Sequence, residues 1–433
     1  MGTVTERQVA HIWKRLGFGA TGKDIDNGVA VGPAALINDL LTRPLTTPSQ
    51  WNLPTASDWQ SEIKYLGRQL QLMGSSSNPL QERMAWVLQG LVVIGIADVV
   101  YFQDLQGHVS RLRGNPFGPF TTLLSDVTVM PGMMKYLNGY QNAAQHPNQN
   151  YARELMELFA LGITHPTTGA QNYTQTDVVE VARALTGYTY DWNTGKIVFD
   201  RSQFDAGNKT FLGAARGDAG VPEVIAAVSK HPAYGYYVPR RLYRELVGLE
   251  PDKATLDHLA TTFGTTGDVK GVVKAIATSP AFLSAAAIGA KVKTPVELIV
   301  SGAKALGFDL STADYGWQMR DFLNQHPFFP PNVSGWPAGH VWLNAGVTMT
   351  WCSIAQDFAV ASSKASGGVA AKLLATASPS TAPTVAARLC GITDLSPASA
   401  SGLATYARGA KWDINRAAGT LALVLVTPEF AVN

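Results

Sequence analysis

The side chains best suited to chemistry lie in the segment Asn148–Gly162. Asn150, Arg153, Glu154 and Glu157 recur there at spacings of three and four residues, which places them on one face of an α-helix. The rest of the helix expected at 150–161 is apolar, so we expect a buried helix whose polar face lies in low dielectric, where carboxyl pKa values shift. Glu154 or Glu157 could then act as a general acid or base, with Arg153 holding an anionic group or an oxyanion.

A second polar stripe, formed by Asp177, Glu180 and Arg183, lies on the next predicted helix among valines and alanines. The two helices could be antiparallel neighbours with facing stripes, and the second stripe would then help to bind a substrate. Two structural interpretations compete with this one. The charges could form an internal ion-pair network that locks the helices together, or they could form a solvated face.

The segment His326–Trp342 is rich in Pro, Gly, Asn and Trp, and we expect it to be an ordered, irregular loop. Trp336, His340 and Trp342, together with Asn332, could bind a ligand, with tryptophan as an apolar wall. Loops of this kind often carry binding residues. The competing interpretation is a loop that its tryptophans pin to the core.

Other catalytic and cofactor motifs are missing from the sequence. The eight histidines include no pair spaced i, i+4, and no His-Glu-x-x-His or Cys-x-x-Cys pattern occurs, so we expect no metal site. No Gly-x-Ser-x-Gly nucleophile turn occurs either. Gly17–Gly22 has the spacing Gly-x-Gly-x-x-Gly but follows a predicted helix rather than a strand, which excludes dinucleotide binding. We therefore expect no cofactor.

Composition limits the classes of partner. The 433 residues carry 34 Lys and Arg against 32 Asp and Glu, a net charge of +2, without the basic stripe of a nucleic-acid-binding protein. The densest basic run, Pro239–Arg244, also contains apolar residues and fits a helix packed on one side better than a phosphate groove. Cys352 and Cys390 could form one disulfide, although two buried free thiols are favoured. A small-molecule substrate is the partner that we expect.

The N-terminus enters a polar helix at once and lacks the basic and apolar regions of a signal peptide. The chain would therefore be cytoplasmic if it is complete. The two most apolar segments, Trp86–Val100 and Ala417–Val426, are too short for a membrane span. The sequence leaves the oligomeric state open.

Helical periodicity dominates the chain. The predicted fold class is mainly α: a large helical domain with a small β-hairpin insertion and a Pro/Trp-rich loop, forming a single domain over 1–433. The hairpin is predicted around Asn193–Lys196, and the last third, 347–430, is predicted to be Ala-rich helix. Other helices are predicted at 6–42 (two, separated by Gly17–Gly22), 80–106, 119–138 (broken near Pro131), 150–161, 177–187, 222–230, 237–247, 253–263, 268–278 and 294–306.

Several motifs, in their order along the chain, resemble the DUF1800 family. The motifs are Arg15–Ala20, Asn148–Gly162, Tyr173–Val178, Ala182–Tyr188, Phe211–Gly213, His231–Ala233, Ser279–Phe282, Lys291–Glu297, Pro330–Pro337 and Trp342. They span about residues 8–350, and the Ala-rich part, 351–433, follows. The resemblance implies a bacterial protein whose relatives are often exported. It implies no reaction, because the family's name records that its function is unassigned.

The sequence departs from the family pattern at positions that could bind metal or move protons. The family commonly has Trp-His-Asn-His-Phe where this chain has Trp86–Val93, without a histidine. Gln149 stands where Glu is common, Phe159 where His is common, and Phe204-Asp205 where His-Asp is common. The chain therefore resembles a divergent member, and a metal site that relatives might use is not expected here.

Two functions follow as hypotheses from these residues. The first is an enzyme that uses carboxylate acid/base chemistry on a small uncharged or anionic molecule, without metal or redox cofactor, and an apolar substrate is a variant of this hypothesis. Its catalytic residues would be Asn150, Arg153, Glu154 and Glu157, and its substrate-binding residues Asp177, Glu180, Arg183, Trp336, His340 and Trp342. The alternative is a non-enzymatic binding or scaffold protein that uses the Trp-rich loop.

Overall fold

A computed structural model describes residues 2–47, 59–96 and 100–433. Its mainly α architecture confirms the predicted fold class. The helices of the first half are α1 (Val4–Arg15), α2 (Gly22–Val31), α3 (Pro33–Thr42), α4 (Trp59–Ser75), α5 (Pro79–Gln89), α6 (Phe102–Gly114), α7 (Phe120–Thr128), α8 (Pro131–Tyr136), α9 (Asn150–Glu154) and α10 (Gln175–Ala184). Those of the second half are α11 (Val221–Lys230), α12 (Tyr234–Val247), α13 (Lys253–Phe263), α14 (Val269–Ala277), α15 (Pro295–Leu306), α16 (Gly316–Asp321), α17 (Ala345–Lys364), α18 (Val369–Thr376), α19 (Ala382–Leu389), α20 (Pro397–Arg408) and α21 (Ile414–Leu425).

The described residues also contain two small antiparallel hairpins. Strand β1 (Tyr188–Asp191) pairs with β2 (Lys196–Phe199), with Tyr188 opposite Phe199, and this is the predicted hairpin. Strand β3 (Thr210–Phe211) pairs with β4 (Ala214–Ala215). This second hairpin was not predicted, since two-residue strands carry no alternation that a sequence pattern could reveal.

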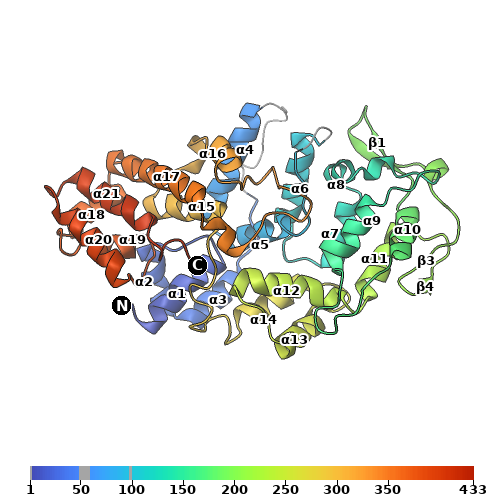
Figure 1. The fold of residues 1–433 in the computed structure, drawn as a ribbon, viewed down its shortest axis with the longest axis horizontal. Coiled ribbons are helices and arrows are strands. Elements are labelled where there is room, and N and C mark those ends of the chain that lie inside the picture. Colours follow the sequence, from blue (N-terminus) through green and yellow to red (C-terminus); the bar gives the residue numbers. More distant parts are fainter. Residues whose placement is uncertain (1, 48–58, 97–99) are drawn as a thin grey trace.

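The elements form an elongated arrangement (Figure 1). Helices α18–α21 occupy one end, the four strands occupy the opposite end, and α5 lies between them. Within the described ranges, no helix has the length and hydropathy that crossing a membrane requires.

Helix starts follow local sequence signals. Thr174 accepts a hydrogen bond from the backbone N–H of Asp177, whose carboxylate accepts one from the backbone N–H of Thr174. Thr294 and Glu297 form the same capping box at the start of α15. Each box satisfies backbone donors that a helix start leaves without partners, so these two boundaries are set within four residues of sequence.

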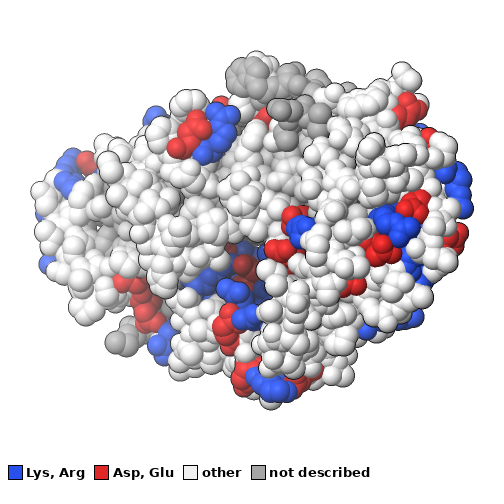
Figure 2. Space-filling model, turned by 45° about the vertical axis from the view of Figure 1, so that its right-hand side comes forward, with Lys and Arg blue, Asp and Glu red and all other residues white. Residues whose placement is uncertain are grey.

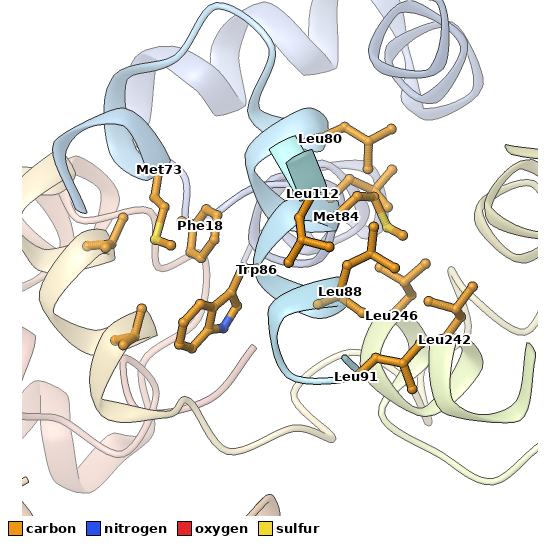
Figure 3. Close-up of a cluster of buried hydrophobic side chains, with 14 of the residues drawn as sticks. Phe18, Met73, Leu80, Met84, Trp86, Leu88, Leu91, Leu112, Leu242 and Leu246 are labelled. Carbon is orange, nitrogen blue, oxygen red and sulfur yellow. The ribbon is translucent and has the colours of Figure 1, made fainter. Parts of the chain in front are cut away.

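Helix α5 lies at the centre of the hydrophobic core, and all of its residues are buried. Figure 3 shows Leu88 beside Leu242 and Leu246 of α12, whereas Phe18 and Met73 lie on the other side, near Trp86. A helix covered on every side cannot present a polar stripe to water. Its charged residues must therefore find partners inside the protein.

The predicted helix 80–106 is wrong in its middle part. Helix α5 ends at Gln89, α6 starts at Phe102, and the described residues between them are not helical. The backbone N–H of Ile96 donates to Phe328 O at 2.9 Å, and a Cβ on Gly95 would overlap Pro330. Tertiary pairing with the Trp-rich loop therefore replaces the helix, and a continuous apolar run does not reveal such a choice.

The second helix predicted within 6–42 is divided into α2 and α3. The break falls at Gly32, which has φ +85° and is followed by Pro33. Glycine adopts this conformation at little cost, and proline is favoured at the first position of the next helix. The sulfur chemistry also differs in part from expectation, because Cys352 and Cys390 are free thiols but only Cys390 is buried.

Candidate functional site

The predicted catalytic face lies on α9 and on the π-helical turn η3 (Leu155–Ala160) that continues it. The backbone N–H groups of Leu161 and Gly162 both donate to Met156 O at 3.0 Å, which closes the wide turn. Tyr237 on α12 donates its hydroxyl to Leu158 O at 3.0 Å. π-helical turns are rare and occur often at functional sites, so Glu157 lies in a local geometry that a plain α-helix would not provide.

Glu154 and Glu157 are close enough to influence each other, and both are half-buried. Burial raises the pKa of Glu154, and the neighbouring Glu157 raises it further, whereas Arg153 opposes the shift. Tyr173 donates its hydroxyl to Glu157 Oε2 at 2.9 Å, and burial together with this carboxylate raises the tyrosine pKa. Glu154 therefore releases its proton at a higher pH than an ordinary glutamate.

Arg153 joins this face to the start of α10. Its Nη2 donates to Gln175 Oε1 at 3.0 Å, and Gln175 Nε2 donates to Gln149 Oε1 at 2.8 Å. Asn150 is exposed at the first position of α9. The two predicted helices are therefore neighbours, but contact between their polar faces involves the glutamines at their starts.

The second predicted stripe turns away from Glu154 and Glu157. Arg183 binds Asp205 at 2.7 Å and Glu180 at 2.8 Å. Glu180 Oε2 also accepts from the backbone N–H of Thr210 at 2.9 Å. Asp177 caps α10 and accepts from the backbone N–H of Leu212 at 2.7 Å. All three residues hold the segment that carries β3, so their contacts join α10 to that segment and not to the helix that carries Glu154.

The three ligand-binding residues predicted in the Trp-rich loop do not all line the same space. Trp336 stacks on Trp86 with ring centroids 5.2 Å apart and an interplanar angle of 27°. Trp342 is buried and donates its indole N–H to Pro337 O at 3.0 Å. His340 is exposed. Trp342 thus pins the loop, while Trp336 and His340 line a cavity.

This cavity has a volume of about 580 Å³, within the range of small-molecule sites. Helix α12, the end of α5 and the Trp-rich loop enclose it. Its charged lining residues are Arg240, Arg241, Arg244, Glu245, Glu250 and Lys291. Figure 2 shows acidic and basic atoms gathered in a hollow near the centre of one face, where most of the surrounding surface is uncharged.

Neither Glu154 nor Glu157 belongs to the lining of this cavity. The link between the two places is Arg241, whose Nη1 donates to Leu158 O at 3.4 Å and whose Nη2 donates to Gly90 O at 2.9 Å. One guanidinium of the cavity wall therefore contacts both the π-helical turn and the end of α5. The structure separates the predicted acid/base residues from Trp336 and His340, but connects them through this side chain.

Ion pairs organise the remaining charges of the cavity. Glu250 accepts from Arg240 at 2.9 Å and lies 3.1 Å from Arg244 Nε. Lys291 donates to Glu245 at 2.6 Å. Burial opposes ionisation of Glu245, but Lys291 outweighs it and the pKa of Glu245 is lowered. Glu245 therefore keeps its negative charge to a lower pH than an ordinary glutamate.

Below the cavity, Lys291 also reaches a buried pair. Its Nζ lies 3.4 Å from Glu297 Oε1, and the same oxygen accepts from Arg83 Nη1 at 2.6 Å. Burial would raise the pKa of Glu297, yet Lys291 and Arg83 lower it strongly. Lys291 therefore joins the cavity lining to a buried ion pair outside it, in which the Glu297 carboxylate is held in its ionised form.

Sequence reasoning identified the run Pro239–Arg244 but assigned it only a packing role. The run does form a packed helix, with Leu242 buried and Pro239 inside it. Its three arginines are at positions 240, 241 and 244, so they project toward one side of the helix. That spacing was the available signal, but nothing in the sequence shows that Trp336 and Lys291 face the same space.

The described residues contain no group of three His, Cys, Asp or Glu side chains arranged to hold a metal ion. What the cavity offers is fixed positive charge, two carboxylates and an aromatic wall. Such a set can bind and orient an anion by charge-assisted hydrogen bonds.

Comparison with known proteins identifies a family, but the description of that family names no reaction. A family model described as "Protein of unknown function (DUF1800)" matches residues 11–432, which includes the Ala-rich part after residue 350. No curated protein and no solved structure matches the chain.

Proposed function

The chain belongs to the DUF1800 family, and we propose that it binds a small anionic molecule in the cavity between α12 and the Trp-rich loop. One observation carries the proposal: four cationic side chains and only two carboxylates line the same cavity, beside Trp336. Opposite charges attract more strongly in a partly enclosed cavity than in open water, because the effective dielectric is lower. An anion is the ligand that this lining favours.

Existing contacts hold several side chains of the proposed binding site in place. Lys291 is largely buried and held between two carboxylates, so it loses little side-chain entropy when a ligand arrives, whereas Arg240 and Arg244 pair with Glu250 at the exposed rim. The stacked Trp86 and Trp336 rings give one rigid apolar wall. This combination of a few placed charges and an apolar surface is typical of small-molecule sites.

Calorimetric titration of the full chain tests the proposal with orthophosphate and benzoate as anions and benzyl alcohol as a neutral probe. We expect measurable affinity for the anions only. Arg244→Gln should weaken anion binding by about tenfold, the loss expected when one charge-assisted hydrogen bond is removed. Arg201→Gln is the matched control, because Arg201 is an exposed arginine whose ion pair with Asp218 lies outside the cavity lining. Equal binding of the neutral probe would contradict the proposal.

A second candidate function is proton transfer by the Glu154–Glu157–Tyr173 cluster on a small-molecule substrate, without metal or redox cofactor. The raised pKa of Glu154 beside a tyrosine-bound carboxylate favours it. Here Glu154 would be the acid and Glu157 the base, with Arg153 and Asn150 at the edge of the same face. The alternative hypothesis, a non-enzymatic binding or scaffold protein, would need the cavity and its Trp-rich loop but no proton transfer by this cluster.

Once a ligand that is turned over has been found, Glu154→Gln, Glu157→Gln and Tyr173→Phe test the second candidate. We expect each glutamine variant to lower kcat by at least a hundredfold, as the loss of a general acid or base does. Tyr173→Phe should move the pH dependence of kcat, since the phenol binds Glu157. Full turnover by both glutamine variants would exclude these residues from the chemistry and leave the binding proposal intact.

A further inference from the structure

The charges that line the cavity do not balance. Four cations face two carboxylates, which leaves a lining charge of +2. Glu250 serves both Arg240 and Arg244, so one carboxylate offsets two guanidinium groups. Glu245 is taken by Lys291. The unbalanced charge therefore belongs to α12.

Arg241 carries part of this unbalanced positive charge. Its guanidinium donates to the carbonyl oxygens of Gly90 and Leu158 and to Tyr237 Oη. The ion pairs described above among the lining residues, Arg240–Glu250, Arg244–Glu250 and Lys291–Glu245, do not include it. Carbonyl oxygens satisfy its hydrogen bonds but leave its full charge. A negative ligand group is the partner that would neutralise it.

A further arginine lies behind the cavity wall. Arg15 is buried, and its Nη2 donates to Val247 O at 3.1 Å and Ala287 O at 3.3 Å. A Cβ on Gly248, which lines the cavity, would overlap this guanidinium. Because Arg15 also binds only carbonyl oxygens through these contacts, it adds positive potential from below the wall.

Aromatic surface adjoins this charge. Trp336 lines the cavity, and Trp86 both lines it and stacks on Trp336. The apolar side chains Val87, Leu91 and Val292 continue this wall. Flat rings pack well on such a surface, in the offset or edge-on geometry that aromatic pairs prefer.

We infer that the ligand is a planar aromatic molecule with a dianionic group, such as a phosphate ester or a pair of carboxylates. The two negative charges match the lining charge of +2, and the ring lies against Trp336. This inference rests on the proposed anion-binding function and names its ligand class.

The test uses probes that differ in charge or in ring, titrated into the full chain at pH 8. Phenyl phosphate and phthalate are aromatic dianions, benzoate is an aromatic monoanion, and glycerol 3-phosphate is a dianion without a ring. We expect the aromatic dianions to bind at least tenfold more tightly than benzoate. Phenyl phosphate should also bind at least fivefold more tightly than glycerol 3-phosphate.

Paired variants separate the two parts of the inference. Arg240→Gln and Arg244→Gln should reduce affinity for phenyl phosphate more than affinity for benzoate, while Arg201→Gln changes neither. Trp336→Leu should reduce the affinity for phenyl phosphate at least fivefold and leave that for glycerol 3-phosphate unchanged. Trp317→Leu, at an exposed tryptophan outside the cavity lining, is the matched control.

The outcomes distinguish this inference from the proposed function. Equal affinity for benzoate and the aromatic dianions would overturn the charge assignment and leave an anion site. Equal affinity for phenyl phosphate and glycerol 3-phosphate would overturn the aromatic part. Failure of every anion to bind, or an equal loss in Arg201→Gln and Arg244→Gln, would overturn the proposed function itself.

Discussion

Arg83 Nη1 lies 2.6 Å from Glu297 Oε1, and both side chains are buried. The pair joins the central helix α5 to the first turn of α15. Arg83 Nε also donates to Gly17 O at 2.8 Å, and Glu297 Oε2 accepts from the backbone N–H of Thr294 at 2.9 Å. This one contact therefore holds three distant segments of the chain together directly beneath Lys291 and the cavity.

Arg83→Met should destabilise the protein by about 3–5 kcal/mol, because it leaves the Glu297 carboxylate buried with fewer partners. Glu297→Gln should cost less, since Lys291 can still bind Glu245 and the amide can still accept hydrogen bonds. Thermal and urea unfolding of the two variants measure these losses. The double variant should recover part of the loss, so strictly additive losses would show that the pair is not coupled.

The buried His108 should make the protein less stable at mildly acidic pH. Burial lowers its pKa to about 4, and its Nε2 lies 2.8 Å from Val92 O. Because the unfolded chain gains a proton near pH 6.5 and the folded chain only near pH 4, the contribution of His108 is complete above pH 6.5 and is lost as pH falls toward 4.

Urea unfolding at several pH values measures this effect. We expect the free energy of unfolding of His108→Gln to depend less on pH between 6.5 and 4 than that of the original chain. His258→Gln removes an exposed histidine and serves as the control. An unchanged pH dependence in His108→Gln would mean that other groups carry the acid sensitivity.

Lys135 anchors the first hairpin. Its buried ammonium lies 2.9 Å from Asp104 Oδ2 and 3.9 Å from the ring centroid of Tyr190 on β1. Lys135→Met should cost about 3–5 kcal/mol, because Asp104 is then buried without its cation. Hydrogen exchange of β1 and β2 should also become faster.

Adding Asp104→Asn to Lys135→Met should restore part of the stability, because no unpaired charge remains. Lys196→Met changes an exposed lysine in the same hairpin and should leave exchange unchanged. If Lys196→Met accelerated hydrogen exchange as much as Lys135→Met, the claim that Lys135 holds the hairpin in place would be contradicted.

Gly248 and Gly307 form a matched pair that isolates the effect of Arg15. Each ends a helix with a positive φ, +84° and +71° respectively. A Cβ on Gly307 would meet nothing within 4 Å, whereas one on Gly248 would overlap Arg15. Gly307→Ala should cost about 1–2 kcal/mol from backbone conformation alone, because the left-handed conformation brings Cβ close to the following carbonyl oxygen, and Gly248→Ala should cost distinctly more. Unfolding of both variants gives the difference, and equal losses would show that Arg15 moves aside freely.

Much of the fold was predictable because its signals are local. Periodicity identified most helices, and the Thr174 and Thr294 boxes mark the starts of α10 and α15 within four residues. The prediction failed between α5 and α6, where the run Leu91–Ile94 is buried without being helical. An apolar run indicates that its residues are buried, but it does not indicate which groups form hydrogen bonds with their backbone N–H and C=O groups.

The candidate site was predictable only in pieces. The spacing of Arg153, Glu154 and Glu157 correctly placed them on one helical segment, but no pattern indicated its π-helical turn. The roles assigned to these residues remain predictions. The sequence predicts that Trp336 and His340 bind a ligand. Both residues line the cavity, but ligand binding by them stays a prediction.

The sequence by itself determined the helical class, the hairpin and the polar face of α9, since each depends on residue types within a few positions. It also determined the family, through motifs that follow one another in order along the chain. Only the tertiary structure decided that Trp86, Arg241, Lys291 and Trp336 enclose one cavity. The same packing turned Glu180 and Arg183 toward Asp205, away from the predicted catalytic face. Such groupings depend on how helices far apart in the chain pack around α5, and long-range packing leaves no spacing in the sequence that can be read in advance.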